Sequence, residues 1–136
     1  MSEFNLDTRL AADCEWVCEL DLCRVLLLKD ANYPWLVLVP RLADCKEIID
    51  LSESQQSLLW QESAMVCRVL QALFKPDKLN VAALGNMVPQ LHIHHIVRYQ
   101  NDASWPKPVW GQCPAKNYDS NELAERVALI ARLLKK

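Results

Sequence analysis

The sequence predicts an α+β fold built around an antiparallel sheet. Short apolar runs typical of strands are interleaved with longer stretches whose apolar residues recur at helical spacing. The turns between neighbouring strand segments are only a few residues long, which favours antiparallel pairing over the long crossovers of a parallel sheet. A length of 136 residues is enough for one core, so we expect residues 1–136 to form a single domain.

The first predicted element is a hairpin, followed by a short helical turn. Residues 24–29 and 35–39 are apolar runs, and residues 30–34 between them have the composition of a turn. Pro40 closes the second strand, and residues 47–51 follow as a single helical turn.

A long helix comes next. Ser52 or Ser54 can cap its start, Ser52 with Gln55 makes a capping box, and Pro76 ends the helix. Spacings of three or four residues define its core-facing stripe, which takes in Leu58, Leu59, Glu62, Met65, Val66, Val69, Leu70 and Leu73.

The second half of the chain is predicted to add two strands and a terminal helix. Asp119 or Ser120 can cap this helix. Two strands are expected over residues 78–84 and 91–99, with a turn between them. An irregular Pro- and Trp-rich segment follows over residues 101–118, and the helix covers about residues 120–134.

The composition excludes several classes of function. Formal net charge is −2 and no block of Lys and Arg appears beyond the last two residues, so we expect no nucleic-acid polymer as a partner. The N-terminus lacks the features of a signal peptide, and no apolar run is long enough to span a bilayer. With six cysteines but no C-x-x-C pair, the chain is expected to be cytoplasmic, with reduced thiols and no membrane partner.

All three histidines lie in one apolar stretch, QLHIHHIV, residues 90–97. Alternate strand residues face the same way, so Gln90, His92 and His94 share one face and His95 lies on the other. The first face has the pattern of a strand that lines a site. For His95 we expect a hydrogen-bonded ring at the edge of the core.

Other interpretations of His92 and His94 remain open at this stage. The two rings suit a surface pair or a transition-metal site, but a metal needs a third ligand and none is adjacent in the sequence. We expect neither a metal nor another cofactor, but a metal-binding protein that uses His92 and His94 with a distant Cys or carboxylate stays open as an alternative. The turn before the strand favours an anion site, because Gly85 allows close approach of the backbone and its amide and that of Asn86 are potential donors.

The segment LNVAALGNMVPQLHIHHIVR, residues 79–98, resembles the histidine triad (HIT) superfamily, in which three histidines alternate with apolar residues. The chain is most similar to small bacterial HIT-like proteins with Gln at the first triad position, here Gln90, and a W-P-x-P-V-W-G stretch, here residues 105–111. The resemblance implies a HIT-like fold with about five antiparallel strands, one long central helix and a C-terminal helix. It also implies a homodimer.

The resemblance further implies a hydrolase or nucleotidyl transferase whose partner is a nucleotide or another small nucleoside phosphate. The enzyme would attack the α-phosphate of an ester, anhydride or phosphoramidate and form a covalent nucleotidyl-histidine. His92 matches the nucleophile, and His94, protonated or hydrogen-bonding, would stabilise phosphoryl oxygens and assist the leaving group. Gln90 would orient its neighbours as the third catalytic residue. The implied nucleotide- and phosphate-binding residues are Asn80, Gly85, Asn86, Asp30 and Asn32.

Departures from the family pattern leave an alternative open. Gln90 replaces a histidine, and Met87 stands where many members have Ser or Thr. Many members also carry an additional histidine before or after the strand that ends at Pro40, where this chain has Trp35 and residues 41–44. These losses are compatible with a nucleotide-binding module without catalysis. Trp105 and Trp110 have two interpretations as well: they pack the irregular segment onto the domain, or one of them walls the nucleotide site or a subunit contact.

Overall fold

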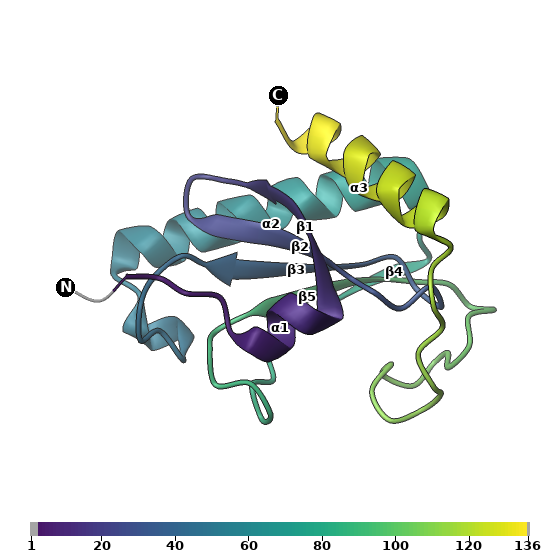
Figure 1. Ribbon diagram of the computed structural model, residues 1–136, viewed down its shortest axis with the longest axis horizontal. Coiled ribbons are helices and arrows are strands. Elements are labelled where there is room, and N and C mark those ends of the chain that lie inside the picture. Colours follow the sequence, from purple (N-terminus) through teal and green to yellow (C-terminus); the bar gives the residue numbers. More distant parts are fainter. Residues whose placement is uncertain (1–2, 136) are drawn as a thin grey trace.

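One antiparallel sheet organises the computed structural model, which describes residues 3–135. Within that range five strands pair in the order β1-β2-β3-β5-β4, as drawn in Figure 1. The strands are β1 (Cys14–Glu19), β2 (Cys23–Leu28), β3 (Trp35–Pro40), β4 (Lys78–Ala82) and β5 (Ile93–Arg98). The expected α+β class and the β2–β3 hairpin are confirmed.

The helices include two long ones on the same side of the sheet. These are α2 (Glu53–Phe74) and α3 (Ser120–Leu134); the short elements are α1 (Thr8–Asp13) and the 3₁₀ turn η1 (Ile48–Asp50). Ser52 and Asp119 cap α2 and α3 as expected, and the capping box of Ser52 with Gln55 is formed. The buried stripe of α2 is narrower than predicted, because Leu59, Val66 and Leu70 are buried whereas Met65 is exposed. None of the helices in residues 3–135 is long and apolar enough to cross a membrane.

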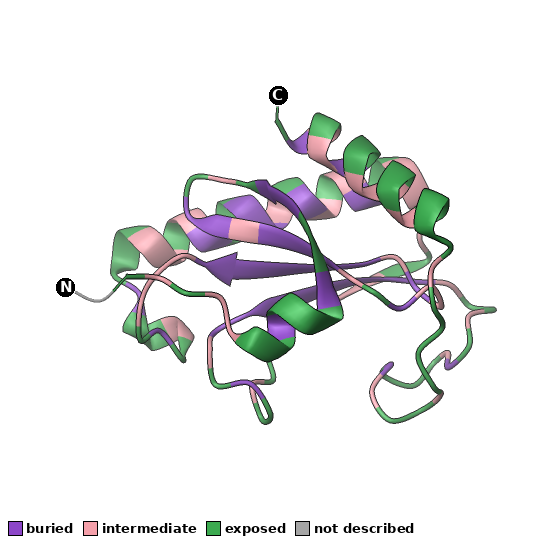
Figure 2. Cartoon of the chain, viewed as in Figure 1, coloured by how far each residue is buried: buried purple, intermediate pink, exposed green. Residues whose placement is uncertain are grey.

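The sheet has a core on each face, so β3 and β5 are buried throughout (Figure 2). α2 and α3 pack on one face against alternate residues such as Leu36 and Ile93. The opposite face carries α1, the turn before β5 and part of the irregular segment, packed on Val37 and Ile96. β3 and β5 are adjacent and central, which places the histidines between the two cores.

Several predicted boundaries were wrong. β5 begins at Ile93, so Leu91 and His92 precede the strand rather than belonging to it. The Leu91 amide donates to the Cys45 carbonyl at 2.9 Å, which takes this part of the chain out of the ladder with β3. β4 ends at Ala82, two residues before the predicted end. The sequence analysis did not predict the helix α1 or the strand β1.

Candidate active site

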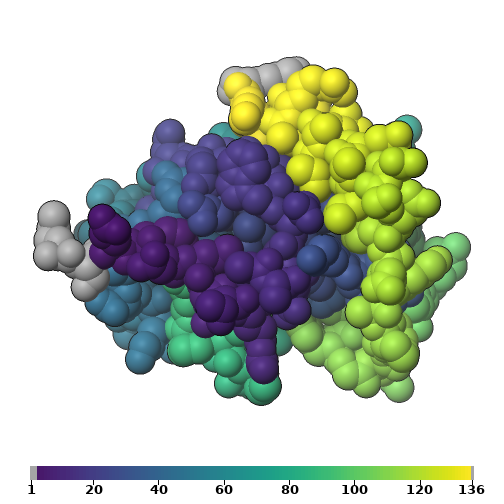
Figure 3. Space-filling model, viewed as in Figure 1, coloured from purple at the N-terminus to yellow at the C-terminus, as the bar shows by residue number. Residues whose placement is uncertain are grey.

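His92 and His94 line a cavity of about 430 Å³ on the face of the sheet that carries α1. Its walls come from α1, the end of β2, the start of β3, the turn before β5 and Trp110 of the irregular segment. In Figure 3 the N-terminal segment lies against this turn on the lower part of the molecule. The volume suits a small organic ligand.

The ring of His92 is held by the backbone of its own segment. Its Nδ1 lies 2.7 Å from the Gln90 carbonyl oxygen. A carbonyl oxygen only accepts, so Nδ1 carries the proton and Nε2 keeps its lone pair.

The ring of His94 has the opposite tautomer. Trp35 Nε1 donates to His94 Nδ1 at 2.9 Å, and an indole nitrogen is a donor only. A neutral His94 therefore carries its proton on Nε2. Burial, followed by the neighbouring His92 and His95, lowers the pKa of His94 to about 3, which keeps the ring neutral near pH 7.

The two rings together present a lone pair and a hydrogen-bond donor to one cavity. Their centroids are 4.9 Å apart and their planes meet at 76°. In residues 3–135 every fully buried side-chain nitrogen or oxygen has a hydrogen-bond partner. The Nε2 atoms of His92 and His94 have no such partner, so neither atom is fully buried and both reach the cavity. This pairing can bring a nucleophile to an electrophilic centre while a donor binds an oxygen on it.

His95 lies on the other face and is fully buried. Its Nδ1 donates to the Ile93 carbonyl at 3.1 Å, and its Nε2 lies 2.8 Å from the Ser63 hydroxyl of α2. Burial lowers the pKa of this ring to about 4. The expectation of a hydrogen-bonded core histidine is confirmed.

The glycine turn forms part of the cavity wall. Gly85 and Asn86 both line the cavity, as does Met87. Gly85 has a φ of 75°, a conformation that strains any residue with a side chain. Within the described chain the amides of Gly85 and Asn86 donate to no other backbone group. They remain available to an anion.

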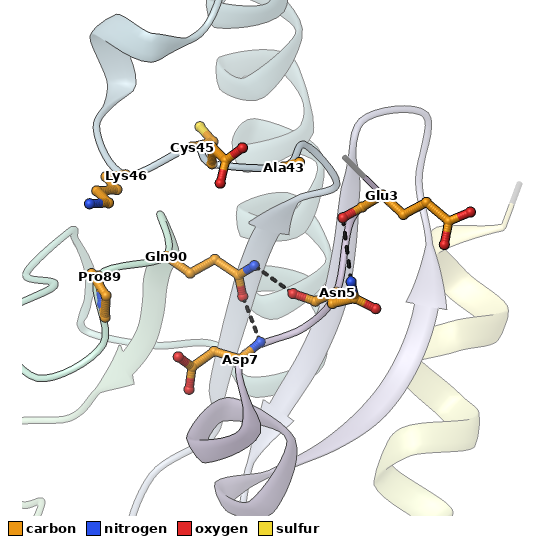
Figure 4. A pocket seen from close by; sticks show the side chains of 9 residues that line it. Glu3, Asn5, Asp7, Ala43, Cys45, Lys46, Pro89 and Gln90 are labelled. Atoms are coloured by element: carbon orange, nitrogen blue, oxygen red, sulfur yellow. Dashed lines mark hydrogen bonds between the residues drawn. The ribbon is translucent and has the colours of Figure 1, made fainter. Parts of the chain in front are cut away.

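The side chain of Gln90 does not line the cavity that holds His92 and His94. Its side chain lies in a neighbouring hollow of about 310 Å³, where Nε2 donates to the Asn5 carbonyl at 2.9 Å and Oε1 accepts from the Asp7 amide at 2.9 Å (Figure 4). Asp7 caps α1 by accepting from the Arg9 amide. The side chain of Gln90 therefore fixes the start of α1, the helix that lines the cavity. The backbone carbonyl of Gln90 is the group that binds His92.

Three residues expected to bind nucleotide do not line the cavity. Asn80 Oδ1 accepts from Arg98 Nη1 at 2.8 Å. Asp30 Oδ1 accepts from the amides of Asn32 and Lys116, and Asn32 Nδ2 donates to the Pro114 carbonyl at 3.0 Å. The contacts of Asp30 and Asn32 tie the hairpin turn to the end of the irregular segment, and Asp30 lines a second cavity that shares Asp13 and Leu28 with the lining of the histidine cavity.

The two tryptophans of the irregular segment have different roles. Trp105 packs against the Arg98 guanidinium, which lies 5.7 Å from its ring centroid. Trp110 lines the cavity, with its ring centroid 5.1 Å from that of His94 and 5.7 Å from that of Trp35. The packing interpretation fits Trp105, whereas the site-wall interpretation fits Trp110.

The charges that line the cavity are few. Arg9 and Asp13 of α1 supply one charge of each sign, and the remaining walls are largely apolar. Within residues 3–135 no group of three or more His, Cys, Asp or Glu side chains is arranged to hold a metal ion. Trp35 and the α1 residues were not anticipated as site residues. The six-residue helix α1 is too short for periodicity to reveal. The sequence marked Trp35 only as an apolar strand residue in a region where many family members carry a histidine.

Comparisons with known proteins agree on one family. Residues 9–101 match the family model of the HIT domain. Solved structures of histidine triad proteins are similar over nearly their whole length: one from Bradyrhizobium japonicum has 47% identity and a TM-score of 0.95, with 98% of this chain and 99% of that chain covered.

A second, from Marinobacter aquaeolei VT8, has 48% identity and a TM-score of 0.95, with 98% of each chain covered. A third, from Sinorhizobium meliloti 1021, has 40% identity and a TM-score of 0.92, with 95% of this chain and 96% of that chain covered. No curated protein sequence matches the chain.

Proposed function

Because the chain belongs to the histidine triad family, whose members are nucleotide-binding hydrolases and transferases, we propose that it cleaves a nucleoside phosphate through a nucleotidyl-histidine at His92. The single observation that carries the proposal is the pair of tautomers at the cavity. The Gln90 carbonyl leaves a lone pair on His92 Nε2, and Trp35 leaves a proton on His94 Nε2.

In the first step His92 Nε2 attacks the α-phosphorus. A P–N bond forms, and the bond from phosphorus to the leaving group breaks with its electron pair on the leaving group. In the second step water attacks phosphorus and releases a proton to solvent, the P–N bond breaks, and its electron pair returns to Nε2. Nδ1 keeps its proton in both steps, and its hydrogen bond to the Gln90 carbonyl strengthens while the ring is cationic.

The negative charge of the phosphoryl oxygens meets donors fixed before the substrate arrives. These are the Nε2–H of His94 and the amides of Gly85 and Asn86, supported by the guanidinium of Arg9. Fixed donors in a largely apolar cavity stabilise developing charge more than mobile water does. Among the described residues Arg9 is the one cationic side chain in the lining, so the cavity favours a nucleotide with a single charge at phosphorus over a polyphosphate chain.

Trapping the intermediate tests the proposal. A nucleoside phosphate with an activated leaving group is expected to add one nucleotidyl group to His92, seen by mass spectrometry of peptides prepared at alkaline pH. His92→Ala should lose the adduct and at least about 10³-fold in turnover while its circular dichroism is unchanged. Nucleotide binding without turnover, or full activity of His92→Ala, would refute the assignment.

Two further expectations belong to the proposal. We expect a homodimer, which sedimentation analysis tests; β4 lies at an edge of the sheet, and Val81 on it is exposed. We also expect a cytoplasmic location, where the nucleotide substrates would be available.

A further inference from the structure

The bond between Trp35 and His94 differs from an ordinary histidine hydrogen bond in having one possible direction. The indole nitrogen has a proton to give and no lone pair to receive one, so His94 Nδ1 must be the acceptor. Both residues are buried, with 5% of Trp35 and 6% of His94 exposed. Trp35 is opposite Ile96 and His94 is opposite Val37, so the two rings meet diagonally across β3 and β5.

This geometry prevents His94 from becoming an imidazolium ion. A proton on Nδ1 would face the indole N–H across 2.9 Å, and the ring has little freedom to turn away. Its T-shaped contacts are the rings of His92, Trp35 and Trp110, with centroids at 4.9, 5.6 and 5.1 Å. Giving up the remaining proton would leave an imidazolate anion among these buried rings, which burial makes costly. His94 therefore donates a hydrogen bond without transferring its proton.

The other groups that face this ring do not replace it as an acid. His92 uses its one proton to bind the Gln90 carbonyl, and His95 points to the opposite core. Arg9 and Asp13 are the charged side chains of the cavity lining. A guanidinium retains its protons in proteins, and a carboxylate is an acceptor.

We propose that Trp35 is a positioning residue that fixes His94 as a neutral donor, and that the site in consequence selects nucleotides whose leaving group departs as a stable anion. This inference rests on the proposed function and narrows its substrate class. Carboxylate and acidic phenolate leave with the electron pair of the broken P–O bond and need no proton. Alkoxides and neutral amines need one, so simple alkyl esters and phosphoramidates are poor substrates.

The first experiment reads the tautomer directly and does not depend on activity. In ¹⁵N spectra of the labelled protein, His94 is expected to carry its proton on Nε2 and to stay neutral between about pH 5 and pH 8. Trp35→Phe keeps an aromatic ring but removes the donor, and its His94 should show a mixture of tautomers. A proton on Nδ1, or titration of His94 within this range in the wild type, would overturn the proposal.

The second experiment measures the leaving-group dependence. A series of nucleotide esters of phenols with graded acidity serves as substrates. The wild-type rate of His92 nucleotidylation should fall about tenfold for each unit by which the pKa of the phenol rises. At about pH 5 the fall should be shallower in Trp35→Phe, because the freed ring can then supply a proton. Trp60→Phe, on the exposed side of α2, is the matched control and should retain the wild-type slope.

The outcomes separate the two proposals. A shallow slope in the wild type, or the same slope in Trp35→Phe, contradicts the role of Trp35 even if His92 is nucleotidylated. Absence of any adduct on His92 contradicts the proposed function instead. The ¹⁵N spectra then still decide whether Trp35 fixes the tautomer.

Discussion

Arg98 is expected to be the most costly charged residue to remove. Its side chain and that of Asp102 are 1% and 4% exposed, and Arg98 Nε lies 2.8 Å from Asp102 Oδ2. The guanidinium also donates to Asp102 Oδ1, to Asn80 Oδ1 and to the Ser104 hydroxyl, at 3.1, 2.8 and 3.2 Å. Burial alone would raise the pKa of Asp102, but the bonds from Arg98 and from the Tyr99 and Ser104 amides lower it to about 2.

The perturbation is Arg98→Met, which keeps most of the buried volume and removes the charge. Asp102 then remains as a buried carboxylate with backbone amides as its only described donors. Breaking a buried pair from one side costs about 3–5 kcal/mol of unfolding free energy. The matched control is Arg24→Met, whose partner Glu19 is 35% exposed and whose loss should cost about 0–1 kcal/mol.

Urea unfolding at equilibrium measures both variants. Adding Asp102→Asn to Arg98→Met should recover part of the loss, because the second change removes the uncompensated charge. A loss for Arg98→Met within about 1 kcal/mol of that for Arg24→Met would refute the reasoning.

The same change should affect the site. Asp102 and Ser104 anchor the start of the irregular segment, and Trp110 of that segment forms part of the cavity wall. We expect Arg98→Met to raise the KM for nucleotide more than it lowers kcat, because it loosens the wall and leaves His92 in place.

Three further outcomes are expected. Gln90→Ala should weaken nucleotide binding by up to about tenfold, measured by calorimetry, because α1 loses its tether at Asp7; unchanged binding would contradict the tether. Gly85→Ala should cost about 1–2 kcal/mol of stability in urea melts and lower affinity, since its φ is 75°; a neutral effect would contradict the strain. The pKa of buried His95 is lowered to about 4, whereas the unfolded chain binds protons near pH 6.5. Stability should therefore be retained above about pH 6.5 and fall by a few kcal/mol toward pH 4, and urea melts that show no fall would refute this.

Local sequence pattern was sufficient for the elements with a long or regular repeat. The capping box fixed the start of α2, and the apolar runs gave the β2–β3 hairpin. Alternation separated His92 and His94 from His95, because neighbouring residues of an extended chain point to opposite faces. The glycine turn was also visible, since Gly85 is one of two glycines in the chain.

Irregular elements escaped the same reasoning. β1 contains a bulge between Trp16 and Cys18, which breaks the alternation by which a strand is recognised. α1 is six residues long, too short for a helical repeat. Leu91 leaves the ladder through a bond to Cys45, a contact between segments far apart in the chain.

The sequence by itself determined that His92 and His94 share one face and that His95 lies on the other, because this depends on the period of the local backbone. Only the tertiary structure decided their partners. Register between β3 and β5 brings Trp35 to His94, and chain packing turns Asn80 toward Arg98 and Asp30 toward Lys116. Strand register and long-range packing depend on the free energy of the whole chain, which no short stretch of sequence contains.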